Sequence, residues 1–122
     1  MATFTEYHSW YETAGTVMEE VANLFTDKTG VDDGEWIDMA GVIRANWVFN
    51  GITTGTVNVM GWNGATAPTA SVHGELATTA VTADGIVTLD EHQMFRFMKV
   101  YISDATSISL DVDFKRVRLL GS

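Results

Sequence analysis

Few side chains in this chain have the types and spacing that catalysis or metal binding requires. The three histidines, His8, His73 and His92, have no second histidine, cysteine or carboxylate at the spacings of zinc motifs. No Gly-x-Ser-x-Gly segment exposes a nucleophilic serine, and no Walker or Gly-x-Gly-x-x-Gly loop is present for a phosphate. We therefore expect His92, beside Glu91, to be a surface histidine, and we expect no catalytic residues, no bound metal, no cofactor and no enzymatic activity.

One acidic cluster, formed by Asp32, Asp33, Glu35 and Asp38, is a candidate cation site, because calcium takes several oxygen ligands from flexible loops. Its spacing differs from that of an EF-hand loop. A solvated acidic loop ahead of a strand explains the same residues. We expect the second of these.

The remaining candidates for chemistry are two carboxylates and a tryptophan. Asp111 and Asp113 share one face of a predicted strand, about 7 Å apart. We interpret them as that strand's solvent-facing side rather than as a pair that hydrolyses glycosides. Trp62 lies beside Asn63 and Gly64 in a predicted loop. A tryptophan there either stacks on a sugar or anchors a protein interface, or it caps the core.

The elements that position these residues are predicted to be β-strands. Apolar and polar residues alternate over 42–50, 56–60 and 107–115, and turn signals recur every eight to twelve residues. In the first of these runs the inward residues are predicted to be Ile43, Ala45, Trp47 and Phe49. About seven or eight short strands at this spacing predict an all-β, antiparallel β-sandwich or jelly-roll-like fold.

The most apolar run, residues 95–102, predicts a central strand. Arg96 and Lys99 fall on its opposite faces. We interpret both as reaching solvent or a sheet edge through their long stems.

Residues 1–30 are predicted to form an N-terminal arm and residues 31–122 the β-sandwich domain. Within the arm, the spacing of Val17, Val21, Leu24 and Phe25 fits a short helix over 16–26, although a bulged strand fits as well. The arm is also rich in aromatic residues, which pack on the domain, on a neighbouring molecule or within a strand of the same sandwich. The candidate interface residues are Phe4, Tyr7, Trp10, Tyr11 and Trp62.

The formal net charge of −9, with seven Lys and Arg against sixteen Asp and Glu, excludes several partners. Such a surface repels phosphate backbones and anionic lipid, so we expect neither nucleic acid nor membrane as a partner. The chain has no cysteine, which rules out disulfides and thiolate metal sites. We read no signal peptide and no membrane span in the sequence, and expect synthesis in a cytosol-like compartment.

Several segments together resemble small virion proteins of tailed bacteriophages. They are Gly34–Met39, Trp47–Phe49, Gly55–Gly64, Phe95–Val100 and Ala105–Leu110. In that family a G-x-W-x-D-L strand leads into a V-x-V-x-G-S-N-D-G segment, and an aromatic-Arg strand and a Thr/Ser-rich hairpin follow. Trp62 stands where the family often has serine, and the aspartate after Asn63 is missing.

The resemblance implies a β-sandwich structural protein of a phage particle, such as a capsid decoration protein or a minor head or tail component. Its partners would be other virion proteins, such as the major capsid or tail protein, and copies of itself. It would be located in the virion after synthesis in the host bacterial cytoplasm. The alternative function is a carbohydrate- or receptor-binding β-sandwich module, with Trp62 and Trp47 as platforms.

Overall fold

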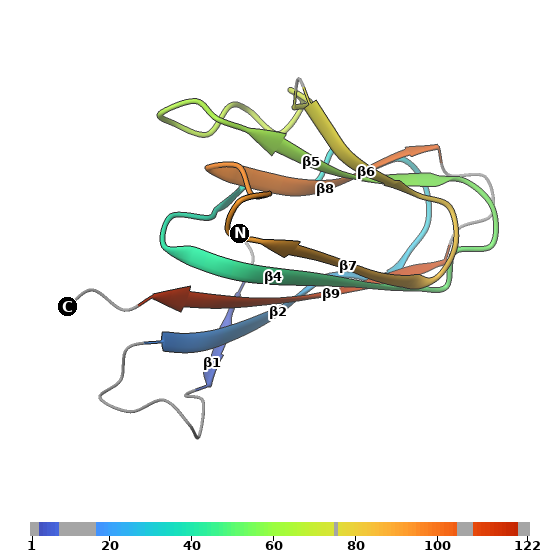
Figure 1. Cartoon of the computed structure of the whole chain (residues 1–122). Helices are drawn as coiled ribbons and strands as arrows, with labels where there is room; N and C mark the ends of the chain where they lie inside the picture. Colours follow the sequence, from blue (N-terminus) through green and yellow to red (C-terminus); the bar gives the residue numbers. More distant parts are fainter. Residues whose placement is uncertain (1–2, 8–16, 75, 105–108, 120–122) are drawn as a thin grey trace.

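The computed structural model describes residues 3–7, 17–74, 76–104 and 109–119, and all the regular elements in this part of the chain are β-strands. Two antiparallel sheets pack face to face (Figure 1). The predicted all-β sandwich is therefore confirmed.

The five-stranded sheet has the order β1 (Thr5–Tyr7), β2 (Val17–Lys28), β9 (Leu110–Leu119), β4 (Val42–Asn50) and β7 (Gly85–Asp90). The four-stranded sheet has the order β3 (Ile37–Asp38), β8 (Phe97–Asp104), β5 (Thr56–Trp62) and β6 (Leu76–Val81). From β2 to β9 the chain changes sheet at every connection except that between β5 and β6. The orders β2-β9-β4-β7 and β3-β8-β5-β6 are those of a jelly roll.

The core lies between the sheets and is built by strands of period two. In β9, Leu110, Val112 and Phe114 are fully buried, and in β4 the Trp47 ring packs 5.0 Å from the Phe114 ring. Burying these apolar faces on each other is the main source of stability in such a sandwich.

One inward residue of β4 was predicted wrongly. The register shifts between Val42 and Arg44 on the β9 side, so Val42 joins the core and Ile43 is only half-buried. A bulge adds one residue to a strand and reverses the alternation beyond it. Ala45, Trp47 and Phe49 point inward as predicted. Trp47 is 0% exposed, so the interpretation of Trp47 as a platform for a sugar is wrong.

The short helix considered for residues 16–26 is not formed, because Val17–Lys28 is strand β2, paired with β9. Its register shifts between Asn23 and Phe25 and again before Lys28. These irregularities bring Leu24 and Phe25, which are adjacent in sequence, both against the core. A bulged strand thus produced apolar spacing that imitates a helix.

Towards the end of β9 the inward positions carry charge. Arg116 donates to the buried carboxylate of Glu20 at 3.0 Å, and Arg118 approaches the same carboxylate at 2.8 Å. Phe4 covers this cluster, with the Arg116 guanidinium carbon 4.0 Å from its ring centroid. The buried charges are paired, which a low-dielectric interior requires.

Candidate functional site

A loop between β5 and β6, the 63–74 loop, runs over the outer face of the four-stranded sheet (Figure 1). Residues 55–74 contain no Asp, Glu, Lys or Arg, although the chain as a whole carries a net charge of −9. Most side chains of the loop are small and exposed, and Val72 is one of the large exposed apolar residues. The loop therefore presents an uncharged surface within an acidic molecule.

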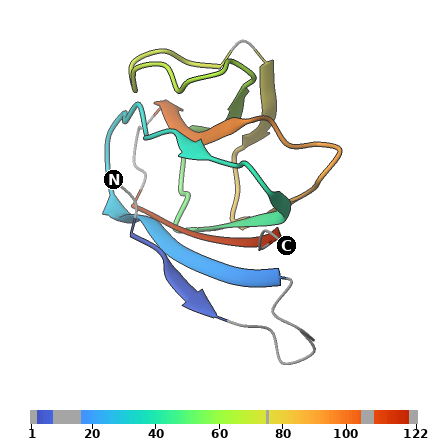
Figure 2. The same ribbon diagram turned by 90° about the vertical axis from the view of Figure 1, so that its left-hand side faces the viewer.

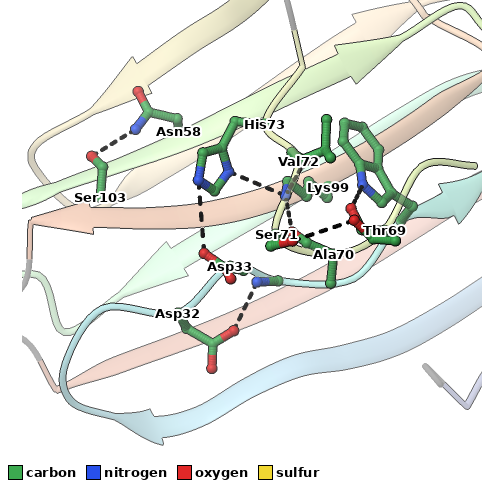
Figure 3. A network of polar contacts seen from close by, with 12 residues as sticks. Asp32, Asp33, Asn58, Thr69, Ala70, Ser71, Val72, His73, Lys99 and Ser103 are labelled. Atoms are coloured by element: carbon green, nitrogen blue, oxygen red, sulfur yellow. Dashed lines mark hydrogen bonds and ion pairs between the residues drawn. The ribbon is translucent and has the colours of Figure 1, made fainter.

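Lys99 holds this loop to the sheet. Its neighbours Met98 and Val100 point into the core, so Lys99 points outward from β8, yet the loop leaves it 0% exposed. Its ammonium donates to the carbonyl oxygens of Ala70 at 2.6 Å and Val72 at 2.8 Å (Figure 3). The interpretation that Lys99 reaches solvent or a sheet edge is therefore wrong.

The ammonium of Lys99 also lies 3.3 Å from His73 Nδ1, so its three N–H groups face three acceptors. Burial lowers the pKa of Lys99, and the negative charges of Asp33 and Asp32 oppose that shift. Because its protons are all directed at acceptors, this lysine positions the loop and is not arranged as a free base or nucleophile.

Trp36 adds a second attachment for the 63–74 loop. Its indole Nε1 donates to the carbonyl oxygen of Thr69 at 3.2 Å. The Lys99 ammonium lies 4.7 Å from the centroid of the Trp36 ring and 5.6 Å from that of Tyr101. Cation–π attraction of this kind stabilises a buried ammonium that water no longer solvates.

His73 closes the network at the end of the loop. Its ring stacks on Tyr101, with centroids 3.6 Å apart, and its Nε2 lies 3.7 Å from a carboxylate oxygen of Asp33. Because Lys99 can only donate, Nδ1 of His73 accepts, and the neutral ring carries its proton on Nε2, facing Asp33. Beside this stack, Asn58 donates to Ser103 at 2.8 Å across β5 and β8 (Figure 3).

The acidic cluster is engaged by cations and by backbone N–H groups. Desolvation acts to raise the pKa of Asp32, but hydrogen bonds from Lys28 and the Gly34 N–H hold it below its usual 3.8. The hydrogen-bonded Arg96 guanidinium lowers the pKa of Asp38. Among the described residues, no group of three or more His, Cys, Asp or Glu could hold a metal ion.

The structure places two of the five predicted interface residues, and they belong to different sheets. Phe4 lies beside β2 and β9 in the five-stranded sheet, where its ring meets Phe114 edge-on at 6.0 Å. Trp62 ends β5 in the four-stranded sheet. Tyr7 belongs to strand β1, but its side chain, like all of Trp10 and Tyr11, lies outside the described residues.

Trp62 packs against the start of the 63–74 loop. A Cβ atom on Gly64 would overlap the indole nitrogen of Trp62, so the close approach of ring and backbone requires glycine there. The same nitrogen is buried and has no hydrogen-bond partner among the described residues. The indole ring therefore lies against the first residues of the 63–74 loop.

The other candidates lie on the surface. Asp111 accepts from the Asp27 backbone N–H at 2.7 Å, and Asp113 accepts from the Asn23 side chain at 3.0 Å. His92 is almost fully exposed. These side chains contact different partners and converge on no common point.

A separate cleft of about 480 Å³ opens between β2 and the segment that precedes β3. Leu24, Phe25 and Val100 supply apolar surface, while Asn23 and Asp32 supply polar groups. Its volume falls in the range of small-molecule sites.

No protein-family model, curated protein or solved structure matches this chain. No helix in the described part of the chain is long and apolar enough to cross a membrane.

Sequence reasoning missed the loop network because its members are far apart in the chain. Lys99, Trp36 and His73 share no motif, and contacts between such positions cannot be read from spacing. One signal was present: Lys99 lies within the most apolar run of the sequence. A charged residue in a central strand is buried only if it is paired, which predicts a covering partner.

Proposed function

We propose that this chain is a structural protein of a bacteriophage virion, either a capsid decoration protein or a minor head or tail component. It acts by packing against other virion proteins, and the 63–74 loop is its docking surface. The observation that carries this proposal is the buried Lys99, whose ammonium fixes an exposed, uncharged loop at two carbonyl oxygens. A loop that is already ordered loses less conformational entropy on binding.

Charge distribution supports the same use of the loop. The fully buried centres of protein interfaces are depleted in charged residues, and residues 55–74 have none. The acidic remainder of the chain favours encounter with a basic surface. The loop can thus be desolvated without burying a charged side chain of its own.

The resemblance to phage virion proteins includes residues that build this loop. Trp36, in the Gly34–Met39 segment, bonds the loop at Thr69, and Gly55–Gly64 supplies strand β5 and the loop's first residues. A jelly roll is used by viral capsid domains and by lectins, so the fold agrees with the proposal without selecting it.

The test uses particles of the phage that encodes the chain. Mass spectrometry of gradient-purified particles should detect the chain as a particle component, in many copies for a decoration protein and in few for a minor component, and immunogold labelling should place it on the particle. Recovery of the chain only from the soluble fraction of the lysate would contradict the proposal.

A loop variant tests the docking surface. Purified Ala67→Arg protein, added to particles that lack the chain, should bind at least about tenfold more weakly than wild type, because a charge enters the contact. Ala40→Arg is the matched control, since Ala40 is also exposed but lies outside the loop. If both variants bind equally well, the loop is not part of the interface.

The cleft of about 480 Å³ favours one alternative, a carbohydrate- or receptor-binding module. A glycan screen with the purified chain tests it. Glycan binding that is lost in the Asn23→Ala variant would support the alternative. The absence of any glycan ligand would contradict it.

A further inference from the structure

Strand β7 forms an open edge of the five-stranded sheet. It pairs with β4 on one side (Figure 1), and no described strand pairs with its other side. Strand β1 forms the opposite edge of the same sheet (Figure 2). Its sequence, Gly-Ile-Val-Thr-Leu-Asp, has no proline or lysine and is rich in β-branched residues. Proteins usually protect edge strands with such residues or with bulges, so an unprotected edge is a template for another strand.

The main-chain groups that face this open edge can be identified. Asp90 donates its N–H to the Gln93 side chain at 3.0 Å, and its carbonyl accepts from the Gln93 N–H at 2.9 Å. Both groups of Asp90 are therefore turned away from β4. In an antiparallel ladder this orientation repeats every second residue, so Thr88 and Ile86 direct their N–H and C=O groups outward as well.

Apolar side chains accompany these groups on both faces of the edge. On the outer face Ile86 is 66% exposed and lies opposite Val48 of β4, which is 38% exposed. On the inner face Val87 packs only partly against the core. These three side chains leave apolar surface in water that a neighbouring strand would cover.

We propose that the β7 edge binds β7 of a second copy of this chain, antiparallel and about a two-fold axis, with Val87 facing Val87. In this register Ile86 of each copy exchanges main-chain hydrogen bonds with Thr88 of the other. The two five-stranded sheets become one continuous sheet. This contact is separate from the 63–74 loop and does not depend on the virion role.

The second copy is favoured because one register covers apolar surface on both faces of the sheet. The two Val87 side chains meet on the inner face, while Ile86 and Val48 of both copies form one apolar cluster on the outer face. In this register Asp84 of the second copy lies opposite Asp90, whose carboxylate is 3.6 Å from the exposed Arg44 guanidinium, so the cation faces two carboxylates at each end. Isologous contacts of this kind close as dimers.

Sedimentation equilibrium of the full chain over a concentration series tests this contact. Wild type should reach twice its 13.3 kDa mass. Ile86→Lys should raise the dimer dissociation constant at least about tenfold, because the charge interrupts the apolar cluster. Val31→Lys is the matched control: Val31 is 61% exposed but lies away from β7, so this variant should dimerise like wild type.

A second variant separates edge pairing from side-chain contact. Thr88→Pro removes an N–H that points away from β4, so the fold should be retained, as circular dichroism will show, while dimerisation is lost. A wild-type monomer at every concentration, or a dimer that both β7 variants leave intact, would overturn the inference. Whether the Ile86→Lys variant is incorporated into particles tests the proposed virion role separately from dimerisation.

Discussion

Replacing Lys99 with methionine tests whether the buried ammonium positions the 63–74 loop or merely stabilises the domain. Methionine keeps an unbranched stem in the same space but removes the N–H groups that reach Ala70, Val72 and His73. A hydrogen bond from a charged donor contributes about 1.5–3 kcal/mol, and withdrawing an ammonium from water costs several kcal/mol. These terms nearly cancel, so the global free energy of unfolding should change by less than about 1.5 kcal/mol.

The local effect should be larger, because two loop carbonyls lose their donor and regain water only when the loop lifts. We expect the opening free energy of the loop to fall by about 1.5–3 kcal/mol, which accelerates amide exchange roughly 10- to 150-fold. The reporter is the Val72 amide, which donates to the Thr69 carbonyl at 3.0 Å. The Val42 amide, which donates to Met39 at the same distance in a turn outside the loop, is the internal control.

Hydrogen exchange measured by NMR, together with urea denaturation, distinguishes the two roles. Lys99→Ala should also lower the global free energy of unfolding, by about 2–4 kcal/mol, because the buried stem is lost. If Lys99→Met leaves the exchange of the Val72 amide unchanged, the ammonium does not hold the loop and the reasoning is wrong.

Three further predictions concern pH and backbone geometry. Burial lowers the pKa of Lys99, so the unfolded chain keeps this proton to higher pH than the folded chain does. The free energy of unfolding should therefore rise with pH up to 10.5, and more steeply in wild type than in Lys99→Met. The Arg96 hydrogen bond lowers the pKa of Asp38, so the stability that this pair contributes is complete above pH 3.8 and is lost as pH falls through the lowered pKa. On acid titration, Asp38→Asn should therefore lose less of its free energy of unfolding than wild type does. Gly34→Ala should lower the free energy of unfolding, measured in urea, by at least about 2 kcal/mol, because Gly34 has φ +72° and a Cβ there would overlap a backbone carbonyl. Gly30→Ala is the comparison: its φ is +94° but the space is open, so it should show only the cost of the backbone conformation.

The strands with strict alternation could be predicted from the sequence because period two directly records which face is buried. Val57 and Val59 are fully buried as expected, and Leu110, Val112 and Phe114 of β9 follow the predicted pattern. Prediction failed where a bulge shifts the pattern by one residue. Such a shift has no local signal, because the extra residue is recognised only against its partner strand.

The loop network could not be predicted for a different reason. Val72 lies in the 63–74 loop, and its backbone carbonyl oxygen accepts a hydrogen bond from Lys99. Backbone carbonyls carry no residue type, so a site built on them leaves no pattern in the sequence. Only the cation is visible, and its burial follows from tertiary structure.

The position of β9 has a consequence for how the chain is synthesised and folded. This strand lies between β2 and β4, but it is C-terminal to every other described strand. Until the ribosome has released it, both neighbours have an unpaired side, and the five-stranded sheet is split into two parts. The sheet is therefore completed only after β9 has emerged, and its folding is slow because its decisive pairings join residues distant in sequence. During that interval the nascent chain is open to aggregation, and a holding chaperone would raise its yield.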